Sequence, residues 1–272
     1  MLKKAREQKV CIPAFNIYNL ETLEAAFAAS KNKRKPLMVA FGEKYLEHAS
    51  FEMIAAMANC LAKNHPVPVV LHLDHCKSMD HIQEAIAAGF TSVMYDGSEL
   101  PLEENIRNTQ KAVEYAHSHG VSIEAELGYM NPEDGSVEAE VEKLLYTDPE
   151  QAFQFVEQTG VDSLAVAVGN AHGVYKSTPH LSLQRLQEIY SKVQIPLVLH
   201  GGSGIPADQI HKAVEIAVAK ININTEIALC GGRSIRNMIE NSGGKEIRLE
   251  KLMKQAQSDM TVTMEEILTQ LS

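Results

Sequence analysis

The feature that most constrains the fold is a succession of eight short apolar segments rich in β-branched residues, each beginning 24–41 residues after the one before. This spacing is typical of units that each contain one strand and one helix. The predicted strands are residues 12–17, 37–41, 67–73, 91–95, 121–127, 162–168, 195–199 and 219–223.

The stretches between these strands have the periodicity of amphipathic helices. The predicted helices are residues 21–30, 51–62, 80–88, 103–118, 149–159, 182–193 and 207–217. Apolar strands that alternate with helices indicate parallel strands covered by helices, and eight units favour a closed barrel over an open doubly wound sheet. We therefore predict a single α/β domain over residues 1–272. A (β/α)8 TIM barrel spans about residues 10–240, and a short C-terminal helical extension spans about residues 241–272.

Composition excludes several classes of function. The chain has 272 residues, with 25 Lys and Arg against 35 Asp and Glu, a net charge of −10. Such an acidic protein is not attracted to nucleic acid or to an anionic membrane. Four scattered cysteines form no Cys-x-x-Cys pair, and no uninterrupted apolar stretch approaches the length of a membrane span. We therefore expect a cytoplasmic protein whose partners are small molecules or other proteins.

Polar residues follow several predicted strands, at the end of the barrel where active sites lie. His75, His172 and His200 follow three different strands. Three converging imidazoles that leave a fourth position open are typical of a catalytic Zn²⁺ site. Because side chains alternate along a strand, His72 and Asp74 share one side while His75 begins the turn. Spacing alone therefore leaves open whether His72 or His75 binds the metal.

Asp74 is the candidate general base beside such a metal, which would polarise a substrate carbonyl. The alternative is that Asp74 only orients a liganding histidine. Two further segments, residues 201–204 (GGSG) and 222–225 (NINT), follow the seventh and eighth strands and each precede a helix. Glycine backbone, hydroxyl groups and helix N-termini at these two places indicate a phosphate site.

These motifs resemble the class II, zinc-dependent ketose-bisphosphate aldolases, which include fructose-bisphosphate and tagatose-bisphosphate aldolases. The similarity runs in order over roughly residues 10–230. The matching strings are 13–16 (PAFN), 72–75 (HLDH), 92–96 (SVMYD), 103–106 (EENI), 124–128 (EAELG), 162–167 (DSLAVA), 172–173 (HG), 199–204 (LHGGSG) and 220–222 (KIN).

The resemblance implies that His75, His172 and His200 bind Zn²⁺, that Asp74 transfers the proton of the C4 hydroxyl, and that Glu126 contacts a displaced zinc. It also implies a site for dihydroxyacetone phosphate, often with a monovalent cation (Na⁺ or K⁺) nearby. The implied substrate- and phosphate-binding residues are Asn16, Gly173, Gly201, Gly202, Ser203, Asn222, Ile223, Asn224 and Thr225. A homodimer or homotetramer is implied as well.

The expected reaction is the reversible cleavage of a fructose- or tagatose-type ketose 1,6-bisphosphate. Departures from the family pattern leave a second substrate class open, a ketose phosphate without the second phosphate. The loop after residue 128 lacks a glycine pair that many relatives carry, and Glu133 is the candidate acid/base there. The end of the second strand, 41–44 (FGEK), lacks the small polar run that holds the distal end of the sugar in many relatives.

Other classes of function remain open. A class I aldolase would need a Schiff-base lysine inside the barrel. We expect Lys220, which opens the eighth predicted strand, to lie away from the chemistry. A non-catalytic partner subunit is disfavoured because Asp74 and all three histidines are present. A different metal-dependent lyase or hydrolase is the remaining alternative.

Overall fold

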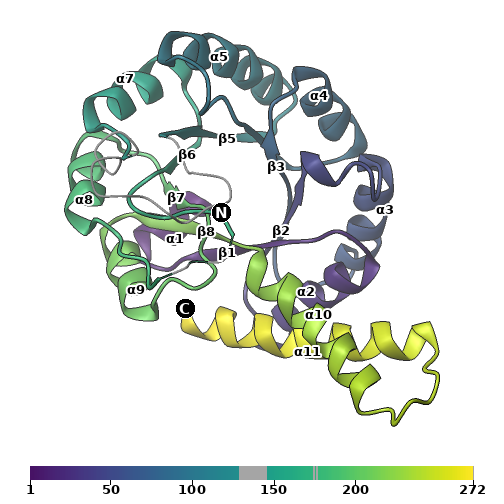
Figure 1. The fold of residues 1–272 in the computed structure, drawn as a ribbon. Helices are drawn as coiled ribbons and strands as arrows, with labels where there is room; N and C mark the ends of the chain where they lie inside the picture. The colour runs from purple at the N-terminus through teal and green to yellow at the C-terminus, as the bar shows by residue number, and fades with distance from the viewer. Residues whose placement is uncertain (129–145, 174, 176, 272) are drawn as a thin grey trace.

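The chain forms a closed barrel of eight parallel strands surrounded by helices in this computed structural model (Figure 1). The structure describes residues 1–128, 146–173, 175 and 177–271. Each strand pairs with its neighbours in sequence, and β1 closes the barrel by pairing with β8. The predicted (β/α)8 architecture is therefore confirmed.

The strands are short and fall within or beside the predicted apolar runs. They are β1 (Ile12–Asn16), β2 (Leu37–Gly42), β3 (Val69–Cys76), β4 (Ser92–Tyr95), β5 (Ser122–Leu127), β6 (Ser163–Val166), β7 (Leu197–Leu199) and β8 (Val218–Ile223). The helices that cover the outside of the barrel or follow it are α2 (Leu20–Lys33), α3 (Phe51–Ala62), α4 (Met79–Ala88), α5 (Leu102–Ser118), α7 (Pro149–Thr159), α8 (Leu183–Lys192), α9 (Ala207–Ile216), α10 (Thr225–Glu240) and α11 (Leu249–Gln270). A 3₁₀ turn, η1 (Glu43–Tyr45), follows β2.

Helix starts are set by local sequence. The side chains of Asn19, Ser50, Ser78 and Ser182 each accept a hydrogen bond from a backbone N–H in the first turn of the helix that follows. Such caps satisfy donors that would otherwise lack a partner at a helix N-terminus. They fix where each connection after a strand ends, and so where the helix begins relative to the barrel rim.

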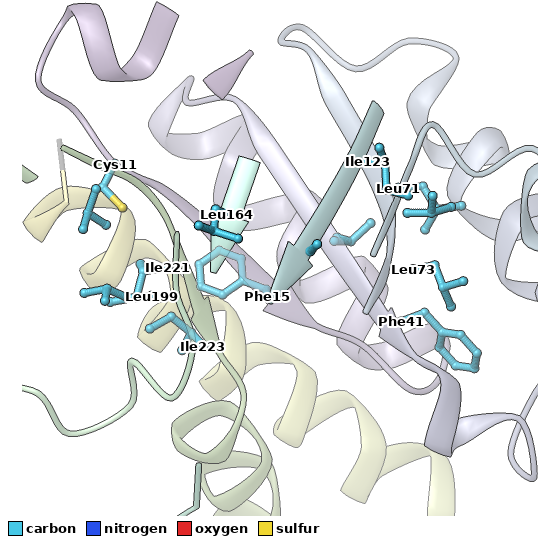
Figure 2. Close-up of a cluster of buried hydrophobic side chains, with 14 of the residues drawn as sticks. Cys11, Phe15, Phe41, Leu71, Leu73, Ile123, Leu164, Leu199, Ile221 and Ile223 are labelled. Carbon is cyan, nitrogen blue, oxygen red and sulfur yellow. The ribbon is translucent and has the colours of Figure 1, made fainter. Parts of the chain in front are cut away.

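Alternation along the strands separates two kinds of interior. Leu71 and Leu73 of β3 and Ile221 and Ile223 of β8 belong to the hydrophobic layer between the strands and the helices, part of which Figure 2 shows. The residues between them, such as His72 and Asn222, occupy the opposite face, inside the barrel. Polar side chains therefore line the barrel, although each strand is apolar overall.

The first and last helices, α1 (Leu2–Glu7) and α11, complete the fold. α1 lies at the amino ends of the strands, where Ala5 packs with small residues of β1, β2 and β8. α11 packs beside α2 and α10 after the last barrel helix (Figure 1). Within the part of the chain that the structure describes, no helix is long and apolar enough to cross a membrane.

Candidate functional site

The carboxyl ends of the strands surround a cavity of about 600 Å³, which is within the usual range for small-molecule sites. Most of the residues predicted from the sequence line this cavity. They are Asn16, Asp74, His75, Glu126, His172, Gly173, Gly201, Ser203, Asn222, Asn224 and Thr225. His200 is fully buried behind them. The predicted residue Glu133 lies outside the described residues.

Three histidine side chains converge at the floor of the cavity. One ring nitrogen from each of His75, His172 and His200 lies within 4.8 Å of the others. Nε2 of His75 is 2.7 Å from Nδ1 of His200. The structure therefore brings the three predicted metal ligands together, from the loops or strand ends of β3, β6 and β7.

Carboxylates hold the outward nitrogens of two of these rings. Nδ1–H of His75 donates to Asp96, with a distance of 2.8 Å, and Nε2–H of His200 donates to Glu124, with a distance of 2.9 Å. A carboxylate behind a histidine fixes its tautomer and aims the other nitrogen at a metal. Both rings are thus oriented with Nε2 of His75 and Nδ1 of His200 facing the same point.

The electrostatics at this point favour a positive charge. Burial lowers the pKa of His75, but the negative charges of Asp74, Asp96 and Glu126 outweigh it and raise that pKa to about 9. Burial and the charge of His75 lower the pKa of His172 to about 3. A bound cation would compete with a proton for the two ring nitrogens, Nε2 of His75 and Nδ1 of His200, that face each other here.

The backbone decides that His75, and not His72, reaches the cavity. His75 has φ of +49°, and the register between β3 and β4 shifts between Leu73 and Cys76. A left-handed residue at such an irregularity breaks the alternation of side chains. His75 therefore points into the cavity together with Asp74. His72 is buried one layer lower, with Nδ1 2.8 Å from Oγ of Ser92.

Asp74 is held in one orientation by two amides. Nδ2 of Asn16 donates to Oδ2 and Nδ2 of Asn222 donates to Oδ1, both at 2.8 Å. Burial raises the pKa of Asp74, but the positive charges of His75, His200 and Lys220 outweigh it and hold the pKa well below its usual value. Asp74 is therefore an ionised, oriented carboxylate beside the histidines.

Glu126 has the opposite character. Its Oε2 atom is buried and has no hydrogen-bond partner among the described residues. Burial, followed by the negative charge of Asp96, raises its pKa well above the usual value. Glu126 and Asp96 also form, with His75, a second group of atoms that could hold a metal ion. Oε2 of Glu126 lies 3.7 Å from Nδ1 of His75. A buried carboxyl oxygen without a hydrogen-bond partner at this position is suited to contacting a cation.

Glycines form the end of the cavity after β7. Gly201 has φ of +63°, and a Cβ atom there would lie 2.0 Å from the carbonyl oxygen of Ala171. Ser203 accepts a hydrogen bond from the backbone N–H of Glu226 in the first turn of α10. Helix N-termini favour anions. Gly202 and Ile223 do not line the cavity, and the side chain of Ile223 is buried in the hydrophobic layer.

We expect Gly201→Ala to reduce the stability of the protein, because the new methyl group displaces the chain at Ala171. Gly120→Ala is the matched control, since Gly120 also has a positive φ, of +70°, but has open space around it. The strain of a left-handed alanine, about 1 kcal/mol, is common to both variants. Urea unfolding of the two variants measures the difference. Equal effects in the two variants would contradict the close packing at Gly201.

Lys220 corrects one expectation from the sequence. It lies inside the barrel and is fully buried, not away from the site. β8 begins at Val218, so alternation places Lys220 on the same face as Asn222. Its Nζ atom is 2.8 and 2.9 Å from the two carboxylate oxygens of Glu124 and 3.4 Å from Nε2 of His72. Lys220 and Glu124 thus form an ion pair directly beneath His200.

Sequence reasoning assigned no role to Asp96 or Glu124. Both stand inside the matching strings, and Glu124 shares the alternating face of β5 with Glu126. That alternation could have indicated from the sequence that Glu124 faces the inside of the barrel. No comparable pattern indicates a role for Asp96, because its hydrogen bond with His75 depends on the irregular register of β3 and β4.

The far end of the cavity is mixed in charge. It is lined by Glu43, Lys44, Tyr45, Lys77, Ser98 and Glu99. Nζ of Lys77 is paired with Glu99 at 2.7 Å. Nζ of Lys44 lies 5.2 Å from the ring centroid of Tyr45, and among the described residues it has no ion-pair partner.

A (β/α)8 barrel whose rim brings three histidines together beside a cavity is typical of α/β enzymes that use a metal ion. The family model described as "Fructose-bisphosphate aldolase class-II" matches residues 1–272. The chain belongs to this family of lyases, whose members are generally metal-dependent.

Two solved structures illustrate the relationship. The YdjI aldolase from Escherichia coli K12 is 35% identical, with a TM-score of 0.88 over 100% of this chain and 95% of that chain. The fructose-bisphosphate aldolase from Campylobacter jejuni is 25% identical, with a TM-score of 0.84 over 99% of this chain and 92% of that chain.

Proposed function

We propose that the chain is a zinc-dependent aldolase that reversibly cleaves a ketose 1,6-bisphosphate of the fructose or tagatose type. The products would be dihydroxyacetone phosphate and an aldehyde. The observation that carries this proposal is the convergence of His75, His172 and His200 beside the ionised Asp74. The cavity that holds these side chains also reaches the glycine turn after β7 and the start of α10, where an anion is favoured.

The histidine set fits a borderline divalent cation such as Zn²⁺. Imidazole nitrogens suit this ion, and three protein ligands leave a position for substrate. Glu126 is the candidate for an additional ligand, since its buried Oε2 atom has no hydrogen-bond partner among the described residues. When bound, Zn²⁺ would supply a positive charge that polarises the substrate carbonyl.

Asp74 would accept the proton of the C4 hydroxyl group as the C3–C4 bond breaks. Its two oxygens already accept hydrogen bonds from Asn16 and Asn222, so the carboxylate does not have to reorient before it acts. The acid/base role of Glu133 remains a proposal from sequence alone.

The phosphate of dihydroxyacetone phosphate would bind between the loops after β7 and β8. Backbone N–H groups near Gly173 and Gly201 would donate to it, together with the hydroxyl of Ser203 and the start of α10 at Asn224 and Thr225. The backbone N–H of Gly202 already donates to the carbonyl oxygen of Asn222 at 3.0 Å, so Gly202 would shape the turn and not bind the phosphate. Because the net charge of the chain is −10, attraction to a phosphate has to be local. A bound Zn²⁺, a monovalent cation (Na⁺ or K⁺) and the helix N-terminus would provide it.

A ketose phosphate without the second phosphate is the second candidate substrate. The charges at the far end of the cavity favour this candidate. Two described lysines line that end, and Lys77 is already paired with Glu99, which leaves Lys44 to attract a second phosphate. We also propose a homodimer or homotetramer in the cytoplasm, by similarity to the family.

The test is cleavage of fructose 1,6-bisphosphate and tagatose 1,6-bisphosphate before and after exhaustive chelation. We expect chelation to abolish triose-phosphate release, added Zn²⁺ to restore it, and borohydride with substrate to leave the enzyme active. Cleavage that survives chelation would contradict the metal-dependent mechanism. Release of inorganic phosphate without triose phosphate would favour a hydrolase, and failure to bind zinc at micromolar concentration would favour a non-catalytic subunit.

A further inference from the structure

Another cluster of metal-ligating side chains lies at the far end of the cavity, where Glu43 forms part of the lining. It consists of Glu43 of η1, Cys76 at the end of β3 and His81 in the first turn of α4, and we call it the sulfur cluster. One ligand atom from each residue lies within 4.8 Å of the others. These residues are separate from the three histidines at the floor of the cavity.

Two of these side chains, Cys76 and His81, face one carboxylate oxygen of Glu43. Oε1 of Glu43 lies 2.6 Å from Nδ1 of His81 and 3.2 Å from Sγ of Cys76. The other oxygen, Oε2, accepts a hydrogen bond from the backbone N–H of Lys77 at 3.0 Å. The carboxylate is therefore fixed on one side and presents its second oxygen to a sulfur and a nitrogen.

We propose that the sulfur cluster is a second metal site, for a borderline divalent cation such as Zn²⁺ or Co²⁺. Thiolate, imidazole and carboxylate are the three ligand types of such ions, whereas Mg²⁺ and Ca²⁺ prefer oxygen. Sγ of Cys76 is also 3.2 Å from the carbonyl oxygen of Ser78. The ion would take the place of the thiol hydrogen, which is shared between Glu43 and Ser78, and of the imidazole hydrogen on Nδ1. The thiol proton would go to solvent, and the imidazole proton would move from Nδ1 to the other ring nitrogen.

Burial and charge support this assignment. Cys76 is fully buried, whereas the side chain of His81 is 37% exposed, so an ion could enter from the solvent side and keep a water as fourth ligand. The carboxylate of Glu43 contacts both other ligands, and its negative charge attracts a cation to this place.

Each ligand also comes from a defined backbone. Cys76 ends a barrel strand, and the backbone N–H of His81 donates to the capping side chain of Ser78. Glu43 is the first residue of η1, and it lines the cavity together with Lys44 and Tyr45 of the same turn. A bound ion would therefore tie the connection after β2 to the start of α4, beside the far end of the cavity.

Cobalt titration of the metal-free protein tests the proposal without reference to activity. The histidine centre has no sulfur ligand, so a thiolate-to-Co²⁺ charge-transfer band in the near ultraviolet reports on the sulfur cluster alone. We expect the unmodified chain to bind two equivalents of Co²⁺, one of them accompanied by this band. One equivalent without the band would overturn the proposal.

Variants assign the band to its ligands. Cys76→Ser and His81→Gln should each lose one equivalent, and Cys76→Ser should lose the band entirely. Cys60→Ser is the matched control, because Cys60 is an exposed cysteine of α3, and it should keep both. His81→Gln changes a partly exposed side chain, so it remains informative if Cys76→Ser does not fold. A band that persists in Cys76→Ser, or disappears in Cys60→Ser, would place the metal elsewhere.

Discussion

Replacing Asp74 with asparagine is expected to lower kcat for aldol cleavage by about 10²–10⁴-fold, the usual contribution of a positioned acid or base. Asparagine has nearly the same shape but cannot take a proton from the substrate hydroxyl. It would also direct an NH₂ group at one of the two amides, Asn16 or Asn222, that now donate to Asp74. Steady-state cleavage of the preferred ketose phosphate measures the effect.

Two controls separate this role from general damage. Asp162→Asn changes a partly exposed carboxylate paired with His117, away from the cavity, and should leave kcat nearly unchanged. Solvent hydrogen exchange into dihydroxyacetone phosphate should fall much less than cleavage in Asp74→Asn, because that ligand has no C4 hydroxyl. Equal loss of both reactions would show that Asp74 has a different role, such as orienting a liganding histidine.

Lys220→Met should lower the free energy of unfolding by about 3–5 kcal/mol, because removing one member of a buried ion pair leaves the other charge unpaired. Glu124 is 2% exposed and would keep its hydrogen bonds from His200 and Ser163 but lose the positive charge of Lys220. The same change should weaken zinc binding, since Glu124 orients His200. Urea unfolding of the metal-free protein and zinc titration measure the two effects.

The double variant Glu124→Gln/Lys220→Met distinguishes an unpaired charge from poor packing. If the charge is the cause, the double variant should be more stable than Lys220→Met alone. Lys212→Met is the surface control, because the Lys212–Asp208 pair is exposed and should contribute less than about 1 kcal/mol. A double variant that is less stable than Lys220→Met would point to lost packing of the long side chain instead.

The position of Lys220 also changes the argument about reaction class. Because a buried lysine is present inside the barrel, the lack of a lysine there is no longer an argument against a Schiff-base mechanism. The argument against Lys220 in that role is its position: its Nζ atom contacts both oxygens of Glu124 and does not line the cavity. The borohydride experiment therefore tests Lys220 together with Lys44 and Lys77, the two described lysines that line the cavity.

Much of the site could be predicted from the sequence because a parallel barrel converts position into proximity. Once each apolar run is placed as a strand, the residues after it must lie at one rim, which brings Asp74, His172 and His200 together. Glycine at position 201 could likewise be tied to a close approach of the backbone. What spacing could not resolve was the choice between His72 and His75, since a left-handed residue and a register shift decide it.

The sequence by itself determined the number of strands, their parallel order and the residue types at the rim, because these follow from local patterns of apolar and polar residues. Only the tertiary structure decided which polar groups pair inside the barrel. Lys220 with Glu124, and Asp96 with His75, join residues far apart in the chain. Their pairing depends on strand register and on a local break in alternation, and a shift of one residue would turn each side chain to the other face.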